Sequence, residues 1–213
     1  MWYRFVQALG QMVFVLFFGY RFYGIRNVPR TGPVILASSH QSFLDPILVG
    51  MPLARPMNSM ARGSLFRNRL FGTLLRNIKA FPVERQSADL GAMREALKRL
   101  NTGGQLLLFP EGMRTSDGSI GTLHPGLAML AARSQAQVVP VVIDGAFECW
   151  PRHRKMFRPG RIWVSYGRPM RYGGQRRKEA EEFMRQLRAS MVELHSRLRA
   201  GRVRVGQGAS GKR

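Results

Sequence analysis

The stretch "PVILASSHQSFLDPILVG", residues 33–50, combines a strand pattern, a polar turn and a helix start. Residues 33–38 suit a buried strand, and residues 44–50 suit a short helix with Pro46 near its beginning. Between them, His40 stands five residues before Asp45. In open α/β sheets, ligands bind outside the carboxyl ends of the strands. The stretch therefore predicts an α/β fold and a candidate site in the turn.

Two interpretations of this turn are open at this point. In the first, His40 is a general base, and Asp45 accepts a hydrogen bond from one ring nitrogen so that the other can take a proton. In the second, Asp45 only caps the helix, because a residue before Pro avoids the helical region and Asp is a favoured N-cap. Side chains five apart do not align on a regular helix, so the first interpretation requires His40 to lie in the turn.

Short apolar runs alternate with helical patterns along the rest of the chain. Strands are expected at residues 78–83, 105–109, 138–143 and 161–166, and helices at residues 87–100, 124–133 and 176–199. Consecutive apolar residues within a strand are typical of a sheet that is buried on both faces. The sequence predicts an α/β domain over residues 24–200, with a central, mostly parallel or mixed sheet flanked by helices.

The N-terminal segment is strongly apolar. Residues 5–20 carry no charge, Arg4 and Arg21 flank them, and aromatic residues lie near both ends, as at a membrane interface. At helical rise they span about 24 Å, short of a hydrocarbon core of about 30 Å. We expect residues 1–23 to form a membrane-anchoring helix that lies in the interface or marginally spans the bilayer. The alternative is a helix packed on the domain's own core.

The charge balance limits the partners. The 213 residues include 34 Lys and Arg against 12 Asp and Glu, a net charge of +22. Such a chain attracts the phosphates of nucleic acid, anionic lipid or phosphorylated small molecules. No nucleic acid is expected, because zinc-finger spacing, an RNA-binding signature and a recognition helix are all missing from the sequence. Four scattered His and one Cys predict no metal site and no internal disulfide. Residues 201–213 are expected to form a basic flexible tail.

Two further strand ends carry charged residues. "LLLFPEGMRTSDG", residues 106–118, leads an apolar strand to Glu111 and Arg114, and "IKAFPVERQS", residues 78–87, leads one to Glu84 and Arg85. A carboxylate and guanidinium groups at one edge of a sheet suit a phosphate or hydroxyl site. A surface ion pair between Glu111 and Arg114 is the simpler alternative.

Together these segments resemble the sequence blocks of the glycerolipid acyltransferase family, typified by the lysophosphatidate acyltransferases. "HQSFLD" is similar to the family's His-x4-Asp block, and "AFPVER" to a block whose arginine holds the acceptor phosphate. "FPEGMRT" is similar to its Phe-Pro-Glu-Gly-x-Arg-Ser/Thr block, and "VVPVVI", residues 138–143, to a fourth with a central proline. His-x4-Asp alone is a weak signal, but four blocks in the family's order between about Gly24 and Tyr166 are a strong one.

The resemblance implies an activity. His40 would deprotonate the acceptor hydroxyl, which attacks an acyl thioester directly, while Asp45 orients and stabilises the imidazolium. The acceptor would be bound by Arg85, Glu111, Gly112, Arg114 and Thr115. Acyl-CoA or acyl carrier protein would be the donor, with no cofactor, and Cys149 would not be needed as a nucleophile. The most typical acceptor is 1-acyl-sn-glycerol-3-phosphate, which gives phosphatidic acid.

The sequence leaves two alternative functions open and favours one cellular location. The acceptor could instead be another lysolipid such as lyso-ornithine lipid, or the chain could be a non-catalytic basic module that binds membrane or nucleic acid. Basic residues after the apolar segment favour the cytoplasmic face of the inner membrane. The expected partners are therefore a membrane lipid acceptor, the acyl donor and an anionic membrane surface.

Overall fold

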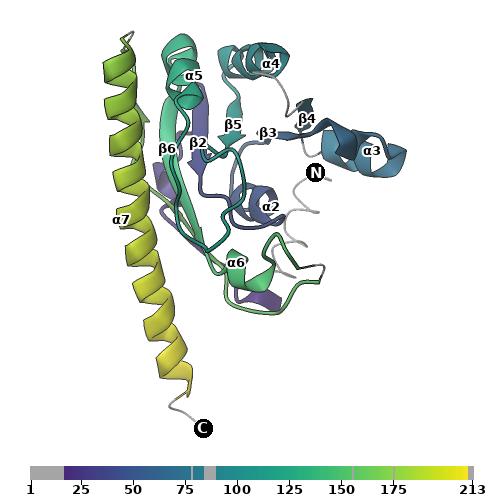
Figure 1. The fold of residues 1–213 in the computed structure, drawn as a ribbon, viewed down its shortest axis with the longest axis vertical. Helices are drawn as coiled ribbons and strands as arrows, with labels where there is room; N and C mark the ends of the chain where they lie inside the picture. The colour runs from purple at the N-terminus through teal and green to yellow at the C-terminus, as the bar shows by residue number, and fades with distance from the viewer. Residues whose placement is uncertain (1–16, 78, 84–89, 155, 175, 211–213) are drawn as a thin grey trace.

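The computed structural model describes residues 17–77, 79–83, 90–154, 156–174 and 176–210 (Figure 1). Within this part of the chain, eight strands form a single mixed sheet. Its order is β1-β7-β6-β2-β5-β3-β4, and β8 also pairs with β6. The strands are β1 (Arg21–Tyr23), β2 (Val34–Ser38), β3 (Met57–Arg62), β4 (Ala80–Val83), β5 (Gln105–Leu108), β6 (Gln137–Asp144), β7 (Trp163–Tyr166) and β8 (Met170–Arg171).

The central strand β2 lies between β5 and β6 and is parallel to both. In the register of these pairs, Leu36 stands opposite Leu107 of β5 and Val139 of β6. The pairs β1–β7, β3–β4 and β3–β5 are also parallel, whereas β7 and β8 run antiparallel to β6. The predicted sheet, mostly parallel or mixed, is confirmed. Parallel neighbours bring the carboxyl ends of β2, β5 and β6 to one edge.

Helices cover both faces of the sheet and create two apolar cores. One core holds side chains of α4 (Leu90–Asn101), α5 (Gly126–Ser134) and α7 (Arg177–Ser210), and the other those of α2 (Asp45–Gly50) and α6 (Ala146–Cys149). Successive residues of β2 alternate between them, because neighbouring side chains of a strand point to opposite faces. Each fully buried Leu, Ile or Val contributes about 1.5–3 kcal/mol, so continuous apolar strands are favoured in this position.

The remaining helices are short or lie at the periphery. Helix α3 (Arg69–Asn77) projects from the β4 end of the sheet, while α7 runs along the opposite side of the molecule (Figure 1). Two 3-10 turns, η1 (Ile25–Asn27) and η2 (Gly63–Phe66), follow β1 and β3.

The described end of the N-terminal segment differs from the expectation. Phe18 and Tyr20 are buried in the second core, and the Tyr20 hydroxyl donates a 2.6 Å hydrogen bond to the Leu48 carbonyl. Residues 21–23 form β1 instead of continuing a helix, since they pair with β7. The predicted helix end at residue 23 is therefore wrong, and residues 1–16 lie outside the described residues. Among the residues that are described, no helix combines the length and apolarity needed to cross a membrane.

Helix α7 is longer than predicted. It continues to Ser210 instead of ending near residue 199, so the backbone of the expected tail is helical up to that residue. Contacts with the domain explain the first part of the extension, at residues 201 and 202. Arg202 pairs with Asp144 at the end of β6, and a Cβ at Gly201 would lie 3.3 Å from the Trp163 ring. This part of the helix is therefore packed on the sheet.

Candidate active site

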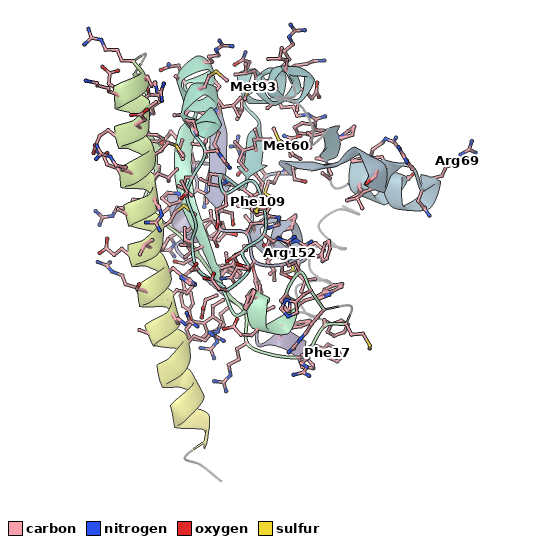
Figure 2. The ribbon with its side chains drawn as sticks, in the orientation of Figure 1. Phe17, Met60, Arg69, Met93, Phe109 and Arg152 are labelled. Atoms are coloured by element: carbon pink, nitrogen blue, oxygen red, sulfur yellow. The ribbon has the colours of Figure 1, made fainter. Side chains whose placement is uncertain are left out.

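The candidate site lies where the carboxyl ends of β2, β5 and β6 meet. The turn after β2 carries His40 and leads into α2 at Asp45. The loop after β5 carries residues 109–115, and β6 leads directly into α6. Phe109, at the end of β5, is labelled near the middle of the molecule in Figure 2. Three separate segments are thus brought together by the parallel arrangement of their strands.

His40 and Asp45 are in direct contact. The His40 Nδ1 atom lies 2.8 Å from Asp45 Oδ2, and the Asp45 side chain is fully buried while that of His40 is 17% exposed. Asp45 Oδ2 also accepts hydrogen bonds from the N–H groups of Gln41 (2.6 Å) and Ser42 (2.8 Å). Both residues precede the helix, and the N-cap is Leu44 without a side-chain bond. The interpretation of Asp45 as only a helix cap is therefore wrong.

The contact with the Asp45 carboxylate favours the His40 tautomer whose proton is on Nδ1. Burial raises the pKa of the Asp45 carboxyl, while hydrogen bonding and charge from His40 and the two N–H groups lower it; the net result is a raised pKa. A histidine with its proton on Nδ1 donates to Asp45 and keeps the Nε2 lone pair for accepting a proton. This arrangement meets the geometric requirement for an oriented general base.

The loop after β5 holds His40 through its ring and its main chain. Its ring stacks on Phe109 with centroids 3.8 Å apart and planes at 14°. Its N–H donates to Glu111 Oε1 at 2.9 Å, and its carbonyl accepts from the Thr115 N–H at 2.8 Å. Ring stacking and two main-chain bonds therefore fix the imidazole relative to the loop after β5.

Glu111 joins two loops through main-chain groups. It is 8% exposed; its Oε1 binds the His40 N–H and its Oε2 accepts from the Gly121 N–H at 2.9 Å. Burial raises the pKa of this carboxyl, although both N–H bonds and the proximity of His40 lower it. The geometry makes Glu111 a support for His40, and its contact with an acceptor stays a prediction.

Three other residues predicted to bind the acceptor, Gly112, Arg114 and Thr115, lie in the loop after β5. The Arg114 guanidinium carbon lies 3.5 Å from the centroid of the Phe43 ring, so Arg114 is beside the His40–Asp45 turn. Thr115 Oγ1 donates to Asp117 Oδ1 at 2.9 Å and accepts from the Gly118 N–H at 3.1 Å, which organises the loop. Gly112 has a φ of +72°, and a Cβ there would lie 3.2 Å from the His124 ring.

Arg85, together with Glu84, lies outside the described residues. Its expected role at the acceptor phosphate remains a prediction from the sequence.

Residues 19–144 match a family model described as Acyltransferase. The chain belongs to the acyltransferase family. It is 27% identical over 169 residues to the 1-acyl-sn-glycerol-3-phosphate acyltransferase of Bacillus subtilis, covering 79% of this chain and 82% of the relative. It is 26% identical over 208 residues to the enzyme of that name from Pseudomonas aeruginosa, covering 96% of this chain and 79% of the relative.

A solved structure shows the same fold. The crystal structure of the 1-acyl-sn-glycerophosphate (LPA) acyltransferase PlsC from Thermotoga maritima matches with a TM-score of 0.73 and 24% sequence identity, covering 88% of this chain and 77% of that one. Together with the two relatives, it confirms the resemblance to the glycerolipid acyltransferases. The chain is therefore an acyltransferase enzyme.

Several residues that support the acyltransferase site were not predicted from the sequence. Gln41 Oε1 accepts from the Phe147 N–H of α6 at 3.2 Å, and Gln41 Nε2 donates to the Gly118 carbonyl at 3.2 Å. Ser42 Oγ donates to the Trp150 carbonyl at 2.9 Å. Polar residues directly after a buried strand are a usable signal, because buried polar groups need partners. Their partners could not be read from the sequence.

The described part of the acyltransferase offers little support for a cysteine nucleophile or for a metal site. Cys149 is buried, and burial raises the pKa of its thiol to about 11, so the reactive thiolate is disfavoured. Among the described residues, no three His, Cys, Asp or Glu side chains are grouped to hold a metal ion.

Proposed function

We propose that the chain transfers an acyl group from acyl-CoA or acyl carrier protein to the free hydroxyl of 1-acyl-sn-glycerol-3-phosphate, which yields phosphatidic acid. The observation that carries the proposal is the 2.8 Å contact between His40 Nδ1 and the buried Asp45 carboxylate. Transfer to a hydroxyl requires a base, and pure lipid binding requires no oriented histidine. The names of the two bacterial relatives support this acceptor.

In the proposed mechanism, His40 Nε2 takes the proton of the acceptor hydroxyl as its oxygen attacks the thioester carbonyl. An ester bond forms, the carbon–sulfur bond breaks, and the imidazolium returns the proton to the departing thiolate. Asp45 stays ionised and stabilises the imidazolium. Positioned general-base catalysis of this kind contributes about 10²–10⁴-fold in rate. The acyl group passes directly between substrates, so Cys149 takes no part.

Arginines would hold the phosphate of the acceptor. Arg114 lies beside the turn that carries His40, and Arg85 is expected at the same edge from its sequence position. A guanidinium can contact a phosphate with two parallel hydrogen bonds, which fixes both the position and the orientation of the acceptor. The net charge of +22 supports two further partners, the phosphate-rich donor and an anionic membrane at the cytoplasmic face.

The test is acyl transfer by the full chain from labelled acyl-CoA and acyl carrier protein to 1-acyl-sn-glycerol-3-phosphate and to lyso-ornithine lipid. His40→Ala is expected to lose transfer with every donor and acceptor, while the exposed His153 offers a matched control in His153→Ala. Retained transfer by His40→Ala overturns the assignment of the base. Preferential transfer to lyso-ornithine lipid reassigns the acceptor while leaving the base in place.

A further inference from the structure

Exposed apolar side chains gather next to the His40–Asp45 turn. Phe17, Phe43, Met156 and Phe157 are 60%, 55%, 79% and 51% exposed. We call these four residues, together with Trp150 between them, the aromatic patch. Large apolar side chains on a surface normally occur singly, and a group of them marks an interaction site.

Ring contacts join three members of the aromatic patch, and Phe43 fixes them to the candidate active site. The Trp150 ring centroid lies 5.8 Å from that of Phe43 and 6.1 Å from that of Phe157. Phe43 belongs to the His40–Asp45 turn, and the neighbouring Ser42 hydroxyl donates to the Trp150 carbonyl. The loop after α6 therefore has a defined position relative to the turn.

Phe17 is the member of the patch that can be located in Figure 2. Figure 2 shows Phe17 and Arg152 on the side of α6, away from Met93 on α4 and from Arg69 on α3. The carboxyl end of β6, which leads into α6, lies on the same side. A partner that covers the patch would therefore also cover the edge of the sheet where His40 lies.

Positive charge surrounds the apolar side chains. Arg152, Arg154 and Arg158 are exposed in the same loop, and the Arg114 guanidinium lies over the Phe43 ring. Between Glu148 and Glu179 the sequence has no acidic residue. Aromatic and Met side chains interleaved with arginines suit the boundary between lipid tails and phosphate head groups, where both kinds of group are satisfied. An acidic protein would match the arginines alone, whereas the lipid boundary matches both the arginines and the exposed Met156 and Phe157 side chains.

We infer that the aromatic patch inserts into the head-group region of an anionic bilayer, so that the His40–Asp45 site faces the lipid surface. The inference rests on the proposed function in one respect, namely that the acceptor is a membrane lipid. It names the loop after α6 as a membrane contact in its own right, independent of residues 1–16. The insertion brings His40 next to the head-group region, where the free hydroxyl of the acceptor lipid lies.

Tryptophan fluorescence tests the insertion without any turnover. The chain has three tryptophans, and Trp163 is buried at 3% exposure, so Trp2→Phe leaves Trp150 as the reporter on the patch. The full-length Trp2→Phe chain is bound to vesicles of phosphatidylglycerol and phosphatidylcholine whose acyl chains carry bromine, a short-range quencher. Quenching that disappears in Trp2→Phe/Trp150→Phe supports the inference. Unquenched Trp150 on vesicle-bound chain, or no binding to these vesicles, overturns it and points to a protein partner.

A second experiment measures the contribution of the apolar side chains. Met156→Ser/Phe157→Ser is compared with Leu90→Ser/Met129→Ser, which removes exposed apolar side chains from α4 and α5. Vesicle partition is expected to fall about tenfold in the first variant and to stay unchanged in the second. Equal partition of both variants with the unmodified chain contradicts the inference.

Turnover separates this inference from the proposed function. Transfer to a short-chain, water-soluble lysophosphatidate should be equal for the Met156→Ser/Phe157→Ser variant and the unmodified chain, whereas transfer to the long-chain acceptor in vesicles should fall. Equal loss on both acceptors overturns a membrane role for these side chains. If no acceptor is acylated at all, the proposed function fails while the quenching result still decides the inference.

Discussion

At the scale of single residues, one oxygen of Asp45 organises the whole turn. Asp45 Oδ2 accepts from His40 Nδ1 and from the N–H groups of Gln41 and Ser42. The same atom therefore shapes the loop and orients the base. The carboxylate is fully buried, which costs free energy unless the charge is hydrogen-bonded. Its presence at this position is explained by the orientation of His40 and not by the start of α2.

Asp45→Asn is expected to lower kcat by about 10²-fold or more, with a smaller effect on KM for the acceptor. The amide oxygen can take the place of Oδ2 and keep the bonds to His40 Nδ1 and the two N–H groups, so the expected loss comes from the missing negative charge that stabilises the imidazolium. Steady-state kinetics on the full chain measure the effect. A kcat within a factor of two of the unmodified chain would show that the negative charge of Asp45 does not support the base.

The sequence predicted the pair of residues but not its surroundings. His40 and Asp45 are close in the chain and follow an apolar strand, so local rules of strand ends and turns bring them together. Glu111 contacts His40 across 71 positions, and Gln41 contacts Phe147 across 106. Such contacts depend on the order of strands in the sheet, which no local pattern encodes. Glu111 was therefore predicted as an acceptor ligand, although its oxygens bind main-chain N–H groups.

At the scale of elements, Glu111 connects the turn after β2 with the loop after β5. Glu111→Gln leaves one acceptor oxygen for two N–H groups and turns an NH₂ group toward the other. We expect the free energy of unfolding to fall by about 1–3 kcal/mol, since a buried N–H loses its partner. Loss of the bond to the His40 N–H lets the main chain of His40 move, and the imidazole moves with it. We therefore expect kcat to fall while KM for the acceptor changes little. Denaturant titration and kinetics test this, and a dominant rise in acceptor KM would instead indicate direct binding.

A second connection fixes α7 to the end of β6. Asp144 is 2% exposed, and Arg202, Arg199 and His195 of α7 surround its carboxylate. Arg202 also contacts Glu148 of α6 at 3.2 Å. Burial acts to raise the pKa of Asp144, but His195 and Arg202 outweigh it and hold this pKa below its ordinary value. The ionised form is therefore favoured by folding.

Asp144→Asn is expected to lower the free energy of unfolding by about 3 kcal/mol at pH 7, because it leaves Arg202 without its buried partner. A depressed folded pKa stabilises the protein above the unfolded value of about 3.9 and loses its effect as pH falls through the folded value. The difference between the two proteins should consequently shrink below about pH 4. Denaturant titrations at several pH values measure it, and a constant difference would contradict the ionic origin.

The elements that the sequence missed have weak local signals. Strand β3 reads "MNSMAR", in which small and polar residues interrupt the apolar pattern, and it pairs with β4 and β5 at the far side of the sheet. Strands β1 and β8 have three and two residues and depend on pairing with β7 and β6. The strands that were predicted are β2, β4, β5, β6 and β7, and each consists mostly of apolar residues. An apolar run of at least four residues can be recognised as a strand in the sequence, whereas a two- or three-residue strand is formed by pairing that no local pattern shows.

At the scale of the whole molecule, the net charge of +22 is expected to attract the negatively charged acyl donor to the site. A strongly positive chain draws negatively charged ligands toward it, and dissolved salt weakens this attraction over a Debye length of about 10 Å at 0.1 M. Acyl-CoA carries several phosphate charges, whereas the matching acyl-pantetheine carries none and has the same thioester. The two donors therefore separate long-range attraction from the chemistry at His40.

We expect kcat/KM for acyl-CoA to fall about tenfold or more when the ionic strength rises from about 0.02 to 0.5 M, with kcat little changed. For acyl-pantetheine, kcat/KM should change by less than about twofold over the same range, because an uncharged donor gains nothing from the field. The acceptor is presented in detergent micelles at a saturating concentration, so that membrane binding does not enter. Parallel salt dependence for the two donors would show that the positive charge acts on the acceptor or on the fold, and not on the phosphates of the donor.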